Sequence, residues 1–182
     1  MSDAIDPRFL EIFPAWLSTL GEDAAALGET IGHQAAAKTH EAARRYLVAG
    51  LNYIFKSLDL IPDGIDDLGY MDDAFVLRVA AALAVADDAS AKDGVIGRLA
   101  DDAAQVKVFL GDDYLRLETY VRGLRKGAAR GRTVDDVMDE DATRATFLSE
   151  VSAWSKEYKT PSFTRDVKTL IKLRAFLSAK LA

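Results

Sequence analysis

The sequence predicts an all-α fold, an irregular bundle of six or seven helices. Apolar residues recur at steps of three and four along most of the 182-residue chain, which is the helical period. Only four prolines and 12 glycines interrupt this pattern, and no segment shows a sustained alternation of apolar and polar residues. Because 49 % of the residues are hydrophobic, we expect residues 1–182 to bury a sizeable core as a single helical domain.

The first third of the chain predicts three helices. Asp6 followed by Pro7 is a typical helix start, because Asp caps the free N–H groups and Pro suits the first turn. Large apolar residues follow at helical spacing, Pro14 is expected to kink or restart this helix, and Gly21 to end it. The next two segments are an alanine-rich stretch and one whose apolar residues trace a single face. The expected helices cover residues 7–20, 22–34 and 38–57.

The remaining helices are separated by recognisable breaks. Pro62 moves the preceding residue out of the helical region, so residues 58–71 are expected to form a structured loop. Gly111 divides a long apolar pattern, Thr133 caps the helix that follows it, and Pro161 precedes the last helix. The expected helices cover residues 72–87, 92–126 with the break at Gly111, 133–158 and 163–181.

Composition excludes several classes of function. The formal net charge of −6 disfavours a general nucleic-acid-binding surface, so we expect no nucleic-acid partner. The absence of cysteine excludes disulfides, thiol catalysis and zinc–thiolate sites. The N-terminus does not resemble a secretory signal, and no run of about 18 apolar residues exists. We therefore expect a soluble, cytoplasmic protein.

Acidic side chains are concentrated in the loop between the third and fourth predicted helices. No lysine or arginine lies between Lys56 and Arg78. Unit charges about 4 Å apart interact by about 4 kcal/mol at an effective dielectric near 20, so such carboxylates need cations, helix N-termini or water. The six aspartates of this acidic loop are Asp59, Asp63, Asp66, Asp67, Asp72 and Asp73.

This segment resembles the YkvA-like family, a bacterial domain of unknown function. The resemblance rests on Leu51-Asn52-Tyr53, on the DLIPD of residues 59–63, and on the LGYMDD of residues 68–73, and it covers about residues 47–85. Ser57 and Asp66 stand where the family usually has proline. The resemblance implies a small helical domain, often near membranes in relatives, and no established reaction. Residues 92–182 then form a helical C-terminal extension.

Two interpretations of the aspartates follow. Oxygen-rich loops suit hard cations, so Asp59, Asp63, Asp72 and Asp73 are candidate ligands for Mg or Ca. In the structural alternative, Asp72 or Asp73 caps the following helix, and Asp63 and Asp66 hold turns through backbone N–H groups. The cations that could neutralise the rest are Arg44, Arg45, Lys56 and Arg78.

A basic run follows the long helical segment. Its glycines at 123, 127 and 131 predict a flexible loop, which either binds phosphate or an acidic partner or is simply solvated. Just beyond it, Asp135 and Asp139 belong to a DDxxD sequence that is similar to the magnesium–diphosphate motif of helical isoprenoid synthases. An acidic first turn after Thr133 explains that sequence more simply. The cations of the run are Arg122, Arg125, Lys126, Arg130 and Arg132.

Two hypotheses of function result. The preferred one is a non-enzymatic binding or scaffolding module, with a protein partner or homo-oligomer and peripheral contact at the inner face of the membrane. The amphipathic first and last helices, the last one basic, support membrane or partner contact as well as packing on their own domain. The alternative is a divalent-metal-dependent enzyme that acts on a phosphate-containing substrate through the acidic loop.

Overall fold

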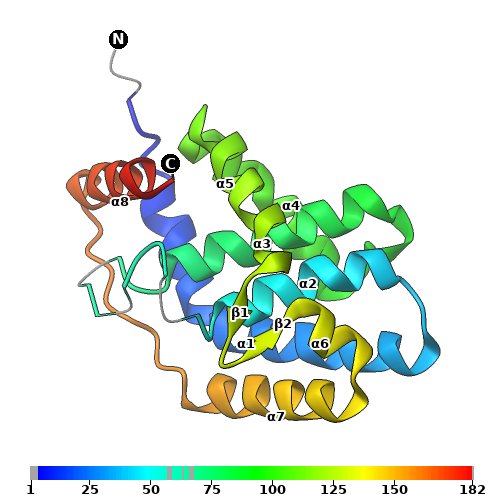
Figure 1. The fold of residues 1–182 in the computed structure, drawn as a ribbon. Helices are drawn as coiled ribbons and strands as arrows, with labels where there is room; N and C mark the ends of the chain where they lie inside the picture. The colour runs from blue at the N-terminus through cyan, green and yellow to red at the C-terminus, as the bar shows by residue number, and fades with distance from the viewer. Residues whose placement is uncertain (1–3, 57–58, 63, 66–67, 182) are drawn as a thin grey trace.

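The computed structural model describes residues 4–56, 59–62, 64–65 and 68–181 and confirms the all-α fold (Figure 1). In that part of the chain there are eight α-helices, two short 3-10 helices and one two-stranded hairpin. The α-helices are α1 (Phe9–Ala37), α2 (Glu41–Tyr53), α3 (Met71–Asp87), α4 (Gly94–Leu110), α5 (Asp113–Gly123), α6 (Val134–Asp139), α7 (Asp141–Glu157) and α8 (Val167–Lys180). The short elements are η1 (Ala89–Ala91), η2 (Leu124–Lys126), β1 (Ala128–Ala129) and β2 (Arg132–Thr133).

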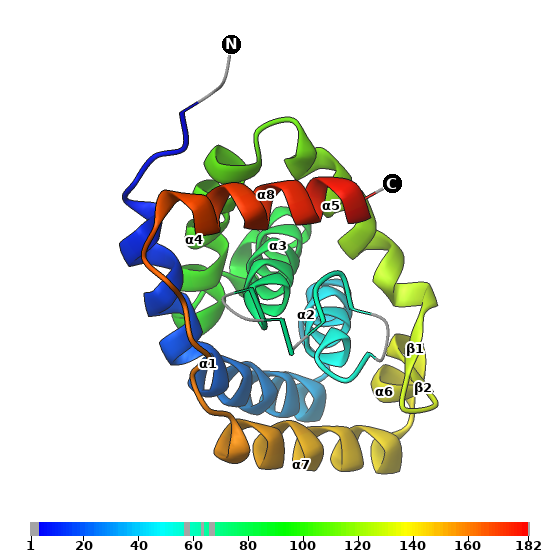
Figure 2. The same cartoon turned by 90° about the vertical axis from the view of Figure 1, so that its left-hand side faces the viewer.

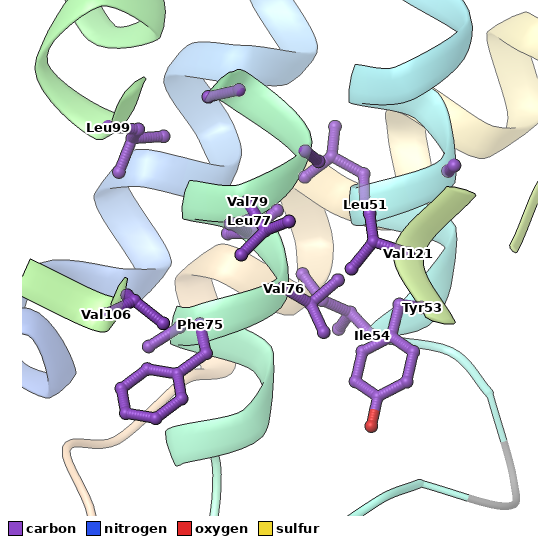
Figure 3. Close-up of a cluster of buried hydrophobic side chains, with 14 of the residues drawn as sticks. Leu51, Tyr53, Ile54, Phe75, Val76, Leu77, Val79, Leu99, Val106 and Val121 are labelled. Carbon is purple, nitrogen blue, oxygen red and sulfur yellow. The ribbon is translucent and has the colours of Figure 1, made fainter. Parts of the chain in front are cut away.

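Helix α3 lies at the centre of the bundle. Figure 2 shows α2 and α3 almost end-on, with the other helices around them. α3 packs most extensively against α2 and α4, and it is apolar on all sides, as expected for a buried helix. Gly50 allows α2 and α3 to approach closely, because a Cβ at this position would lie 2.9 Å from the Cβ of Ala80. Side chains from α2, α3, α4 and α5 form one apolar cluster between these helices (Figure 3).

Helix α1 is continuous, which corrects the prediction of two helices separated at Gly21. Pro14 also lies inside it. Gly21 is used for a close approach rather than for an end: its added Cβ would lie 3.1 Å from the carbonyl oxygen of Ser155 and from the ring of Tyr158. In a single sequence, a glycine needed for close packing cannot be distinguished from a glycine that ends a helix. The predicted end at Gly21 was wrong because this glycine serves a contact with a distant segment.

Two other predicted helices are shorter than expected. α2 begins at Glu41 rather than at residue 38, because Lys38 and His40 both adopt a left-handed conformation with φ of 54°. The helix predicted over 133–158 is two helices, since Glu140 is extended between α6 and α7. Thr133 caps α6 as expected, within a reciprocal capping box with Asp136.

The glycine-marked segment after α5, where the sequence predicted a loop, contains a 3-10 helix and a short β-hairpin. Gly123 is the last residue of α5, and β1 and β2 pair as an antiparallel hairpin. The two residues of its turn, Arg130 and Gly131, have φ of 50° and 75°, the pattern of a tight hairpin turn.

Helix α8 lies across one end of the bundle (Figure 2). It begins at Val167, later than the predicted residue 163, because Asp166 accepts a hydrogen bond from the backbone N–H of Lys168 and caps it. Leu170, Leu173 and Leu177 bury its inner face. Among the described residues, no helix combines the length and apolarity needed to cross a bilayer.

One group of charges is enclosed by the bundle, and we call it the Arg78 cluster. Arg78 is 0 % exposed, donates from Nη1 to the carbonyl oxygen of Ala74 (3.0 Å) and from Nε to Asp102 (3.2 Å), and lies 3.9 Å from Asp23. Its guanidinium also stacks 4.0 Å from the ring centroid of Trp16. Burial lowers the pKa of Arg78 to about 10, against the opposing charges of Asp102 and Asp23. The remaining member is Arg98, which donates to Asp23.

Candidate functional site

The acidic loop is described only in part. Asp63, Asp66, Asp67 and Ser57 lie outside the described residues. Asp72 and Asp73 belong to the first turn of α3 and are 0 % and 2 % exposed.

Asp72 connects the two helices of the hairpin through Tyr53. The hydroxyl of Tyr53, the last residue of α2, donates to Oδ2 of Asp72 at 2.5 Å. The backbone N–H of Leu60 donates to the Tyr53 oxygen at 2.7 Å, and that of Ile61 donates to Asp72 at 3.3 Å. These contacts, which we call the Tyr53 lock, join α2, the intervening segment and α3 at the end of the apolar cluster (Figure 3). Every residue of the lock lies in the motif that suggested the YkvA-like resemblance.

The electrostatics of the lock suit a carboxylate at this point. The N-terminus of α3 favours negative charge, and two donors converge on one oxygen of Asp72. Burial, and then the charge of Asp72, strongly raise the pKa of the Tyr53 hydroxyl. Tyr53 therefore remains a neutral donor at physiological pH.

The metal site stays a prediction. Among the described residues, no three acidic or histidine side chains are grouped closely enough to hold an ion. Asp59, Asp72 and Asp73 are described, but the fourth candidate ligand, Asp63, is not. Asp72 is engaged in the Tyr53 lock and accepts from the backbone N–H of Ile61, whereas the N-cap position of α3 is Tyr70, so capping of α3 by Asp72 or Asp73 stays a prediction.

The cations expected to neutralise the acidic loop make other contacts. Arg45 lies 3.0 Å from Glu41, Lys56 donates to the hydroxyl of Tyr120 at 3.2 Å, and Arg78 belongs to its own cluster. Arg44 is buried within α2.

The basic run of residues 122–132 divides into two groups. Arg130 and Arg132 lie at the β-hairpin, where both pair with Glu150 of α7. Their guanidinium carbons lie 4.4 Å and 5.6 Å from the ring centroid of Phe55, and Arg132 also stacks 5.2 Å from Phe147. Arg132 is nearly buried, so these two residues attach the hairpin to its neighbours.

The other three cations line a cavity of about 340 Å³ together with residues of α2. We call it the basic pocket. Arg122, Arg125 and Lys126 come from the end of α5 and from η2, and Arg45 comes from α2. Figure 1 shows α2 next to the β-hairpin and α6, so the fold joins segments that are far apart in sequence. The remaining lining residues are Ala42, Tyr46, Ala49, Asp87 and Val121.

Among the described residues, the arginines of the basic pocket are held by contacts of 3.2 Å or longer, except for the 3.0 Å ion pair between Arg45 and Glu41. Nε of Arg45 and Nε of Arg125 lie 3.4 Å and 3.3 Å from the same oxygen, Oδ1 of Asp135. Arg122 donates to the hydroxyl of Tyr46 at 3.2 Å and lies 3.5 Å from Glu118.

These contacts leave donor capacity for a ligand. The side chains of Arg122 and Arg125 are 51 % and 54 % exposed. A guanidinium has five N–H donors, so these arginines can bind an oxyanion without breaking the fold.

Sequence reasoning found three cations of the basic pocket and missed Arg45 and Tyr46. The one signal for these residues was their place on the helix of the YkvA-like motif, and nothing in the sequence places α2 beside η2. The DDxxD sequence is also explained: Asp135 pairs with Arg45 and Arg125, and Asp136 caps α6. It is the acidic first turn of a helix, as the simpler interpretation predicted.

A larger groove of about 630 Å³ lies between the N-terminal segment, the α4–α5 turn and α8. Its charged lining mixes Asp6, Asp112 and Asp113 with Arg174. Because three carboxylates face one arginine in this lining, the groove lacks the excess of cations that the basic pocket has.

Comparison of the chain with models of protein families, with curated proteins and with solved structures found no match.

Proposed function

We propose that this protein is a non-enzymatic binding module that takes up a phosphate-bearing ligand in the basic pocket. The observation that carries the proposal is the convergence of Arg45, Arg122, Arg125 and Lys126 on one cavity of a chain whose net charge is −6. Such a local concentration of positive charge attracts anions against the field of the whole protein.

The chemistry of the lining favours a phosphate ester. Arginine forks bind phosphate oxygens in pairs, and a cavity of about 340 Å³ is in the usual range for small-molecule sites. The ring of Tyr46 supplies an apolar wall for the rest of the ligand.

Titration with phenyl phosphate, followed by calorimetry, tests the proposal. We expect wild-type protein to bind with a dissociation constant below about 1 mM, which is the affinity that a few strong charged contacts provide. The double variant Arg122→Gln, Arg125→Gln is expected to bind at least about tenfold more weakly. Lys172→Gln removes an exposed cation of α8 outside the pocket and serves as the matched control. Folded wild-type protein that does not bind at millimolar phenyl phosphate would contradict the proposal.

The phosphate can belong to a soluble metabolite or to a lipid headgroup, and the two sources are separable. Flotation with vesicles that contain phosphatidic acid, beside vesicles of phosphatidylcholine alone, reports headgroup binding at the membrane. Loss of flotation in the double variant assigns it to the pocket. Flotation that persists in that variant would instead indicate contact through another surface, such as the basic helix α8. We further propose that the protein is cytoplasmic and makes peripheral contact with the membrane, or binds a protein partner or a second copy of itself. The hairpin of α2 and α3 is in this proposal a YkvA-like core.

The metal-dependent enzyme is the second candidate. It is favoured by the burial of Asp72 and Asp73 at the start of α3, beside the segment that carries Asp59. A thermal-shift screen with Mg²⁺, Mn²⁺ and Ca²⁺ tests it, with Asp63→Asn as the variant. A melting temperature that no cation changes in either protein would eliminate this candidate.

A further inference from the structure

The basic pocket already has an anion at its edge. Oδ1 of Asp135 lies 3.4 Å from Nε of Arg45 and 3.3 Å from Nε of Arg125, so one carboxylate oxygen is shared by two guanidinium groups. These arginines come from different helical segments, and Asp135 comes from α6. A phosphate that each guanidinium grips in bidentate fashion through Nε and Nη would need the two Nε–H groups that Asp135 now accepts.

We propose that Asp135 is an internal competitor that occupies the anion position until a ligand displaces it. The inference rests on the proposed function, because it assigns the regulation of the same pocket. In the ligand-free protein Asp135 connects α6 to α2 and η2. Binding of the phosphate releases Asp135, and occupancy of the pocket is thereby transmitted to α6.

The contacts of Asp135 are those of a replaceable group. Both distances exceed the usual length of a charge-assisted hydrogen bond, which is about 2.7–2.9 Å. The side chain of Asp135 is 48 % exposed, so water hydrates it when it leaves. Exposed ion pairs of this kind contribute little to stability. A ligand phosphate carries a charge of about −1.5 to −2 at pH 7, and therefore attracts both arginines more strongly than a carboxylate does.

Release of Asp135 does not require α6 to unfold. The N-terminus of α6 is held by the capping box between Thr133 and Asp136, in which Asp135 takes no part. Val134 and Val137 anchor the helix in the core. An Asp135→Asn variant is for these reasons expected to fold.

Two ligands of different charge distinguish competition from a simple electrostatic field. Phenyl phosphate is close to a dianion at pH 7, and phenyl sulfate is a monoanion. If Asp135 must leave before either ligand binds, Asp135→Asn removes the same cost for both, and both affinities rise by the same factor. If Asp135 stays in place and only repels the ligand, the repulsive energy is about twice as large for the dianion as for the monoanion. Asp135→Asn then raises the affinity for phenyl phosphate by about the square of the factor by which it raises the affinity for phenyl sulfate.

The experiment is calorimetric titration of both ligands into wild-type protein, Asp135→Asn and Asp139→Asn. Asp139 is an exposed aspartate of the same helix without a contact to either arginine among the described ion pairs, so its variant controls for charge alone. We expect Asp135→Asn to strengthen both ligands by about fivefold, within twofold of each other, as loss of two weak ion pairs implies. Asp139→Asn is expected to change either affinity by less than about twofold, as an exposed charge without an ion pair to these arginines among the described residues does.

The other outcomes overturn the inference. Unchanged affinities in Asp135→Asn, or a gain for phenyl phosphate that approaches the square of the gain for phenyl sulfate, would show that Asp135 is no competitor, while wild-type binding would leave the proposed function intact. Absence of binding in all three proteins would remove both. As a second readout, amide signals of residues 134–139 in nuclear magnetic resonance spectra are expected to shift on saturation of wild-type protein, and to shift less in Asp135→Asn.

Discussion

The Arg78 cluster and the basic pocket both gather arginines and aspartates, yet they differ in how the charges are satisfied. Arg78 is 0 % exposed and has its own acceptors, Asp102 and the carbonyl oxygen of Ala74, with a stacked indole on one face. In the basic pocket, Arg45 and Arg125 share one oxygen of Asp135, and Arg125 is 54 % exposed. Arg78 therefore stabilises the fold, whereas the half-exposed Arg125 retains N–H donors that face solvent.

The difference teaches that a buried arginine is held by structure and an exposed group of arginines is available for binding. Breaking a buried ion pair leaves an uncompensated charge in a low dielectric, which is costly. Removing one member of an exposed pair leaves a charge that water hydrates. Substitution of an arginine should thus lower stability in the Arg78 cluster and lower ligand affinity in the basic pocket.

The largest effect is expected for Arg78→Ala. Loss of the guanidinium leaves Asp23 and Asp102 without their central cation and removes the stacking on Trp16, so unfolding should become easier by about 3–5 kcal/mol. Urea denaturation followed by far-ultraviolet circular dichroism measures this change. A decrease of less than about 1 kcal/mol in the free energy of unfolding would show that the Arg78 cluster contributes little to stability.

A smaller loss is expected for Tyr53→Phe, which removes one hydroxyl from the Tyr53 lock. Hydrogen bonds to a charged group contribute about 1.5–3 kcal/mol, so the free energy of unfolding should fall by that amount. The matched control is Tyr46→Phe, whose hydroxyl is bonded to the half-exposed Arg122 and whose loss should cost less than about 0.5 kcal/mol. Equal losses of stability in the two variants would mean that the Tyr53 hydroxyl contributes no more than an exposed hydroxyl does.

Alkaline pH gives a second test of the Tyr53 lock. The pKa of Tyr53 in the folded protein is raised above its ordinary value of 10.0, by burial first and then by Asp72. Above pH 10 the unfolded chain loses this proton and the folded protein keeps it, so stability falls as pH rises. The fall is about 1.4 kcal/mol for each unit of pH per proton.

Since other buried tyrosines contribute to the same slope, the comparison with Tyr53→Phe isolates the residue. The stability difference between wild-type protein and the variant should shrink from pH 10 to pH 11.5 in urea titrations. A difference that stays constant over this range would contradict the raised pKa.

The smallest effect on stability is expected for Arg125→Gln. Its half-exposed ion pair with Asp135 should contribute no more than about 0.5 kcal/mol to the free energy of unfolding, although phenyl phosphate should bind more weakly. Urea denaturation and calorimetry on the same sample measure both quantities. A stability loss as large as that of Arg78→Ala would erase the distinction between the two regions.

Sequence reasoning was most accurate where local chemistry decides the structure. The cap at Thr133 follows from a side chain that bonds its own backbone, and the break at Gly111 follows from a positive φ that glycine adopts readily. It failed at Gly21, where the glycine makes room for α7, and at Glu140, where one helix becomes two. Those features depend on neighbours that are distant in the chain.

The candidate site shows the same division. The basic run was visible in the sequence, but only the fold separates Arg130 and Arg132, which attach the hairpin, from Arg122, Arg125 and Lys126, which line the pocket. The partners of Asp135 were equally hidden, because an acidic first turn predicts a helix start and says nothing of which arginines lie opposite.

By itself, the amino-acid sequence determined that this chain is helical, where most helices begin, and which segments carry concentrated charge. These properties follow from spacing, capping and composition, which act over a few residues. Tertiary structure alone decided that Tyr53 reaches Asp72, that Arg78 is enclosed, and that Arg45 joins η2 around a cavity. The physical reason is that such contacts depend on how helices cross, and the crossings are decided by packing of the whole core.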